Sequence, residues 1–92
     1  MMTIDDKMKI VENIAVISDS WDKMLLIMCK KLDDKKLYEN TVALQTEVMF
    51  QMLTNTVLRM TKNNKVRKKL AEYYCTKKLE LLDTRNDNND DT

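Results

Sequence analysis

The 92-residue sequence contains no glycine and no proline. Hairpin turns and most connections between strands depend on the backbone freedom of glycine or on the rigidity of proline. A chain without either residue is therefore expected to consist of helices joined by short polar turns. The same absence argues against a nucleotide cofactor, because glycine-rich loops let backbone amides approach phosphate groups closely.

Histidine is also absent, and the only two cysteines, Cys29 and Cys75, are far apart in the sequence. Their separation matches neither a zinc site nor a disulfide framework, so we interpret them as free thiols in a reducing compartment. The adjacent aspartate pairs lack the alternating spacing and the turn glycine of a calcium loop. The sequence thus predicts no metal and no cofactor.

Without histidine, the commonest general base near neutral pH is missing. Among the remaining groups, Cys75 has Lys77 and Lys78 nearby, and Glu47 lies in an otherwise uncharged stretch. We interpret Cys75 as a packing residue and expect Glu47 to have either a polar opening or a partner such as Arg59. The sequence therefore predicts no enzymatic activity.

Long apolar runs and a strong net charge are missing too. The longest apolar run, residues 24–29, is far shorter than the roughly 20 residues of a membrane-spanning helix. The beginning of the chain lacks the basic-then-apolar pattern of a secretory signal. A net charge of +1 provides no overall field toward nucleic acid or lipid. We expect an intracellular, cytoplasmic protein that does not bind membranes.

The residues that are present follow helical periods. Residues 4–32 carry one continuous apolar stripe that keeps its phase through Ser18, which favours a single helix of roughly 43 Å. Thr3 and Asp6 have the spacing of an N-terminal capping box. The stripe consists of Ile10, Ile14, Ile17, Trp21, Met24, Leu25, Met28 and Leu32.

Two further helices are predicted over residues 35–62 and 65–83. Asp33 or Asp34 is suited to cap the first of them, and Asn63 and Asn64 are suited to end it in a left-handed conformation. The helix over 35–62 is apolar on most sides, which is typical of a central helix. Residues 84–92 are polar without periodicity, so we predict a single helical domain over 1–83 and a disordered acidic tail over 84–92.

The predicted fold is an all-α bundle of three main helices, a long helical hairpin plus a third helix. These helices carry apolar residues in more directions than a chain of this length buries, so we expect homo-oligomerisation to complete the bundle. We predict a small regulatory, adaptor or inhibitor protein without turnover, which binds a protein partner and itself. The expected oligomer interface is Ile10, Ile14, Ile17, Trp21, Met24, Met28, Ala71, Cys75, Leu79 and Leu82.

A concentration of positive charge suggests an alternative function. No acidic residue occurs between Glu47 and Glu72, and the basic residues between them are candidates for contact with phosphates or an acidic partner. A helical dimer would present two such patches at a fixed spacing, which suits a nucleic-acid duplex. This basic segment, residues 59–69, contains Arg59, Lys62, Lys65, Arg67, Lys68 and Lys69.

Overall fold

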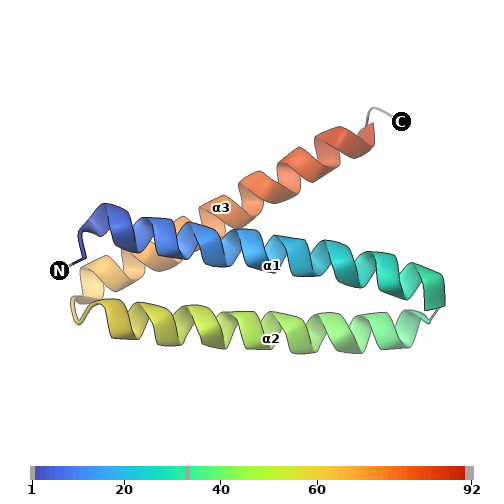
Figure 1. The fold of residues 1–92 in the computed structure, drawn as a ribbon, viewed down its shortest axis with the longest axis horizontal. Coiled ribbons are helices and arrows are strands. Elements are labelled where there is room, and N and C mark those ends of the chain that lie inside the picture. Colours follow the sequence, from blue (N-terminus) through green and yellow to red (C-terminus); the bar gives the residue numbers. More distant parts are fainter. Residues whose placement is uncertain (1, 33, 91–92) are drawn as a thin grey trace.

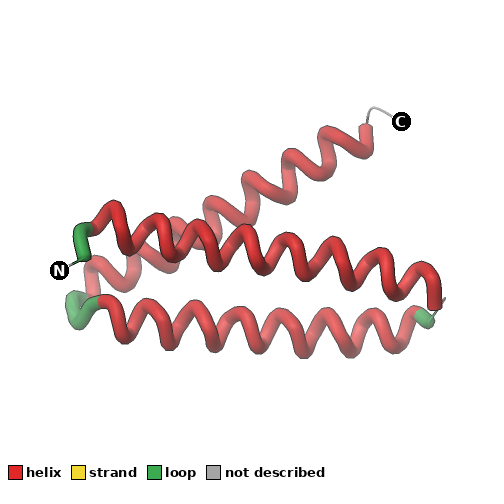
Figure 2. Tube along the Cα trace, in the orientation of Figure 1, coloured by secondary structure: helices red, strands yellow, loops and turns green. Residues whose placement is uncertain are grey.

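The computed structural model of the chain describes residues 2–32 and 34–90, except for the side chains of Leu32 and of residues 85–90. Three helices, α1 (Ile4–Leu32), α2 (Lys35–Met60) and α3 (Asn64–Asp90), account for nearly all of this part of the chain (Figure 1). Within it the connections are short and no strand occurs (Figure 2). The predicted all-α bundle of three main helices is confirmed.

The first helix begins at a reciprocal cap. The backbone N–H of Thr3 donates to Asp6 Oδ2 at 3.1 Å, and the N–H of Asp6 donates to Thr3 Oγ1 at 3.1 Å. These bonds satisfy two N–H groups that lack partners within the helix, and the acids in its first turn suit the helix dipole. The predicted bounds 4–32 are confirmed, and α1 continues through Ser18 without a break.

The two turns are built by polar side chains. Asp34 caps α2 by accepting the N–H of Leu37 at 2.9 Å, whereas Asp33 lies outside the described residues. At the other end of α2, Thr61 has an extended backbone and donates its N–H to Val57. Asn63 Oδ1 then accepts the N–H of Lys65 at 2.9 Å. The second turn occurs in this region as predicted, but the expectation that an asparagine ends α2 is wrong. The cap of α2 is Thr61, and Asn63 caps α3.

The third helix is longer than its apolar pattern. We placed its end at residue 83, whereas α3 extends to Asp90. Thr84 Oγ1 donates to the carbonyl of Glu80 at 3.0 Å, as expected within a continuing helix. Residues 84–90 contain no glycine or proline to stop a helix, so the loss of apolar periodicity does not mark the end of α3.

The core lies at one end of the bundle, around the α2–α3 turn, where all three helices meet. Val11 of α1, Leu53 and Val57 of α2, and Leu70 of α3 are buried together there. Burial of a side chain of this size stabilises the fold by about 1.5–3 kcal/mol. The half-buried side chains packed around this cluster are Met8, Met60, Val66, Tyr73 and Tyr74.

Beyond this core, the third helix leaves the other two. The hairpin of α1 and α2 stays antiparallel along its length, and α3 packs mainly against α1 and diverges toward its C-terminal end (Figure 1). The hairpin is therefore covered by α3 on one side only, and for part of its length. No helix in the described part of the chain is long and apolar enough to cross a membrane.

Candidate functional site

The divergence of α3 opens a groove of about 650 Å³ between the three helices. The floor comes from α1, and the walls come from the first half of α2 and the middle of α3. On α3 the wall is formed mainly by Cys75, Leu79 and Leu82. The core-facing side of the same helix carries Val66, Leu70 and Tyr73. The groove is lined by Ser18, Asp22, Leu26, Tyr38, Val42, Gln45, Thr46, Met49, Phe50, Tyr74, Cys75, Lys78, Leu79 and Leu82.

A lysine of α3, Lys78, contacts α1 at the floor of the groove. Lys78 Nζ of α3 donates to Ser18 Oγ at 3.0 Å and to Asp22 Oδ2 at 2.8 Å, both on α1. Ser18 and Asp22 are four residues apart, so they lie on the same side of α1. The ammonium and the carboxylate neutralise each other, and their bonds hold α3 against α1 at the point where α3 begins to diverge.

A second polar group in the groove has no such partner. Gln45 of α2 is only 2% exposed, and no hydrogen bond from any described residue reaches its side-chain amide. An unpaired buried amide costs about 1–3 kcal/mol. The position is therefore unfavourable for the isolated fold, and it places an unused donor and acceptor at the groove wall.

Carboxylates border the groove on both walls. Glu39 and Glu47 lie three residues before Val42 and Phe50 on α2, while Glu72 and Asp83 lie near Cys75 and Leu79 on α3. Residues three or four apart are neighbours on a helix surface. All four acids are exposed, and none forms an ion pair with a described residue. We call Glu39, Glu47, Glu72 and Asp83 the acidic rim.

The outer side of α3 is anchored by a second polar cluster. Lys77 Nζ lies 3.2 Å from Glu80 and 4.0 Å from Glu12 of α1, and 5.5 Å from the centre of the Tyr73 ring. The hydrogen bond from Lys77 to Glu80, together with the negative charge of Glu80, raises the pKa of Lys77 above its usual value. Tyr73 donates to Glu12 at 3.4 Å. These contacts, with those of Lys78, fix α3 and therefore the groove.

The opposite side of the hairpin is a second apolar surface. Ser18 and Asp22 of α1 contact α3. At about 100° per residue, Ile17 is turned away from them by about 100° and 140°. In Figure 1, α1 passes in front of α3, so the viewer sees this uncovered side. Met24 and Met28 lie within about 20° of Ile17 on α1, and four exposed apolar residues of α2 share an arc of about 80° that is turned away from the groove residue Phe50. We define the hairpin face by these exposed apolar side chains: Ile17, Met24, Met28, Leu37, Leu44, Val48 and Met52.

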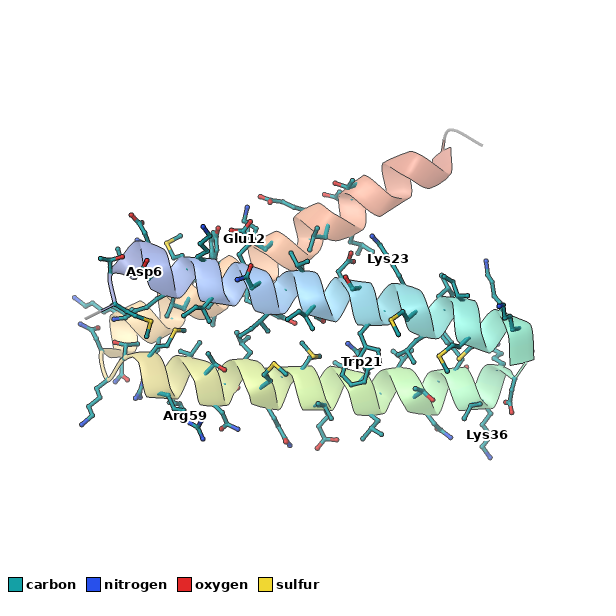
Figure 3. All side chains as sticks on the ribbon, viewed as in Figure 1. Asp6, Glu12, Trp21, Lys23, Lys36 and Arg59 are labelled. Atoms are coloured by element: carbon teal, nitrogen blue, oxygen red, sulfur yellow. The ribbon has the colours of Figure 1, made fainter. Side chains whose placement is uncertain are left out.

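The ten residues predicted to form an oligomer interface are divided between four environments. Ile14 is buried within the single chain, whereas Ile10 and Trp21 are half-buried. Figure 3 shows Trp21 between α1 and α2. Ile17, Met24 and Met28 belong to the hairpin face, Ala71 is exposed on α3, and Cys75, Leu79 and Leu82 line the groove.

Sequence reasoning missed the contribution of α2 to both surfaces. Its buried residues are Gln45, Met49, Leu53 and Val57, a single row at intervals of four, and its other apolar residues remain accessible. The signal was the distribution of apolar residues around nearly the whole helix. Without knowing where α3 lies, that distribution does not separate the groove side from the hairpin face.

The basic segment surrounds the α2–α3 turn. Arg67 is half-buried, and its Nε donates to the carbonyl of Thr61 at 2.8 Å, so this residue stabilises the turn. In Figure 3, Arg59 extends from α2 on the side away from α1. Five exposed cations have no ion pair with any described residue: Arg59, Lys62, Lys65, Lys68 and Lys69.

The residues considered for catalysis are dispersed. Glu47 is exposed on the acidic rim and forms no ion pair with Arg59. Cys29 and Cys75 are free, and Lys77 and Lys78 contact carboxylates. Over the residues that the structure describes, no three cysteine or acidic side chains converge in an arrangement that would hold a metal ion.

Comparisons of the chain with protein-family models, with curated proteins and with solved structures find no match.

Proposed function

We propose that the chain is a non-enzymatic interaction protein of regulatory, adaptor or inhibitor type, which associates with a second copy and binds a protein partner. The observation that carries this proposal is the hairpin face, a surface of seven exposed apolar side chains on two adjacent helices. Contiguous apolar patches on a protein surface mark sites of interaction.

A second copy suits the hairpin face by shape. Two antiparallel hairpins packed face to face form a four-helix arrangement, the common solution for helices with one apolar side. Two helices roughly 40 Å long and 10 Å wide present roughly 800 Å² per copy. This area is typical of a stable protein–protein interface.

The energies also favour association of moderate strength. The side chains of the hairpin face are about half exposed, so completing their burial gives roughly 1 kcal/mol for each. The sum over two copies is comparable with the cost of association, about 4–15 kcal/mol. We therefore expect a dimer whose population depends on protein concentration.

The variant Leu44→Glu tests the hairpin face. Leu44 is 62% exposed, so the folded monomer tolerates the change, whereas a dimer would bury an unpaired carboxylate. We expect self-association to weaken at least about a hundredfold, as measured by sedimentation equilibrium. The matched control is Phe50→Glu, at a 65% exposed position on the groove side of the same helix. Equal effects of both substitutions would contradict an interface on the hairpin face.

Nucleic-acid binding by a helical dimer is the second candidate function, and the five unpaired cations of the basic segment favour it. Exposed lysines and arginines without protein carboxylates are available to replace the counterions of a phosphate backbone. The segment presents no exposed aromatic side chain for base stacking, so contacts would be with the backbone of a duplex.

Charge reversal of Lys65, Lys68 and Lys69 tests this second function. If the segment binds duplex RNA or DNA, the triple glutamate variant is expected to lose salt-sensitive binding in a fluorescence anisotropy titration. The control reverses Lys31, Lys35 and Lys36, three exposed lysines at the opposite end of the hairpin. Unchanged binding in the first variant would rule out this role for the basic segment.

A further inference from the structure

We propose that the groove between α2 and the diverging half of α3 binds a basic amphipathic helix of a partner protein. This inference rests on the proposed function, because it names the chemistry of the protein partner and the surface that receives it. Three properties of the groove support a helix of this composition: its size and lining, the charge of its border, and the unpaired amide of Gln45.

The dimensions of the groove suit one helix. Its lining extends from Tyr38 to Phe50 on α2 and from Tyr74 to Leu82 on α3. At ~1.5 Å per residue, these walls are roughly 18 and 12 Å long, which corresponds to about two to three helical turns. A helix placed there would contact α1, α2 and α3 at once and complete a local four-helix arrangement.

The lining defines the buried side of that helix. Leu26 on the floor, Val42 and Phe50 on α2, and Leu79 and Leu82 on α3 are apolar and accessible or half-buried. Partner helices in such grooves anchor with apolar residues at positions i, i+3 or i+4, and i+7. Positions i to i+7 span about two turns, so the groove accommodates all three anchors.

The border of the groove selects the charge of the helix. The acidic rim places two unpaired carboxylates on each wall, and α2 has no basic residue between Lys36 and Arg59. The exposed Lys35, three residues before Tyr38, lies only at the end of the groove next to the α1–α2 turn. Of the nearest lysines on α3, Lys77 contacts Glu80 and Lys78 contacts Asp22. Lysine or arginine side chains flanking the apolar anchors would pair with this rim, whereas acidic ones would be repelled.

Gln45 adds a polar contact within the apolar surface. Its amide is buried, forms no hydrogen bond with any described residue, and belongs to a residue that lines the groove. A serine, threonine, asparagine or glutamine among the partner's anchors would supply the missing hydrogen bond and fix the register of the helix. A purely apolar ligand would leave the amide unpaired.

The chain's own basic segment does not have the composition of this ligand. Its exposed side chains Lys62, Lys65, Lys68 and Lys69 form a charged surface without an adjacent exposed apolar stripe on α3. A helix from a different protein therefore suits the groove better than a second copy of this chain.

Two synthetic peptides of about 14 residues test the proposal against the full-length chain. Both carry leucines at i, i+3 or i+4, and i+7 with one glutamine among them; the remaining positions are lysine and alanine in one peptide, and glutamate and alanine in the other. By fluorescence anisotropy we expect the lysine peptide to bind at least about tenfold more tightly, with an advantage that shrinks at high salt.

Substitutions then locate the binding site. Phe50→Glu and Leu79→Glu, at positions 65% and 61% exposed, are expected to weaken binding of the lysine peptide at least about tenfold. The control Leu44→Glu, on the hairpin face, is expected to leave it unchanged. Glu39→Gln with Glu47→Gln should reduce the preference for the lysine peptide.

Several results would overturn the proposal. They are equal affinity for both peptides, binding that is insensitive to Phe50→Glu and Leu79→Glu, or no binding of either peptide. Binding of the apolar dye ANS in the groove without binding of the lysine peptide would indicate a small-molecule site instead. If the chain is monomeric but binds the lysine peptide, only the proposed self-association is contradicted. If the chain dimerises but does not bind the peptide, only the proposed helix-binding groove is contradicted.

Discussion

Replacing Leu70 by alanine is expected to lower the free energy of unfolding by about 3 kcal/mol. Leu70 is 0% exposed and packs against Val11, Leu53 and Val57, so it joins all three helices at the closed end of the bundle. The substitution removes buried apolar surface and leaves a cavity that the neighbouring side chains fill only in part.

This effect is measured by urea denaturation followed by far-UV circular dichroism. Wild type and variant are compared at the same protein concentration, because association contributes to the apparent stability. The control is Leu79→Ala, the same chemical change at a 61% exposed position of the same helix, which should alter stability by less than about 0.5 kcal/mol. A loss below about 1 kcal/mol for Leu70→Ala would contradict a core centred on the α2–α3 turn.

Unlike Leu70→Ala, the replacement of Gln45 by methionine is expected to stabilise the protein. We expect the free energy of unfolding to rise by about 1–2 kcal/mol. Methionine has a similar volume and shape, and it removes the buried amide that has no hydrogen-bond partner among the described residues. Substitutions of buried polar residues usually destabilise a protein, so a gain at this position distinguishes an unpaired amide from a paired one.

The matched control is Gln51→Met on the exposed surface of α2, for which we expect a change within about 0.5 kcal/mol. Destabilisation by more than about 1 kcal/mol for Gln45→Met would mean that the amide is satisfied in the folded protein. If Gln45→Met stabilises the protein, Gln45 lowers the stability of the fold. Functional sites commonly reduce stability, so this result would be consistent with a role of Gln45 in binding.

Local features of the helices were predictable from the sequence. The cap formed by Thr3 and Asp6 and the cap at Asp34 depend on residues close together in the chain, and both occur where their types and spacing indicated. The end of α3 was not predictable in the same way. Without glycine or proline, the sequence near residue 83 contains no local signal that stops the helix.

The arrangement of the helices was less accessible to prediction. The divergence of α3 depends on contacts between distant residues, such as Lys78 with Asp22 and Tyr73 with Glu12. That arrangement determines why Gln45, rather than another polar residue of α2, is buried. It also determines how the apolar residues are divided between the groove and the hairpin face. Periodicity identifies apolar directions on each helix, but the partner for each direction is set by tertiary structure.

The most direct test of self-association is the molar mass of the chain in solution, measured by light scattering over a series of protein concentrations. The hairpin face predicts a mass that rises toward twice the 10.9 kDa of the chain as concentration increases, and that Leu44→Glu returns to the monomer value. A constant mass of 10.9 kDa at every concentration would contradict it.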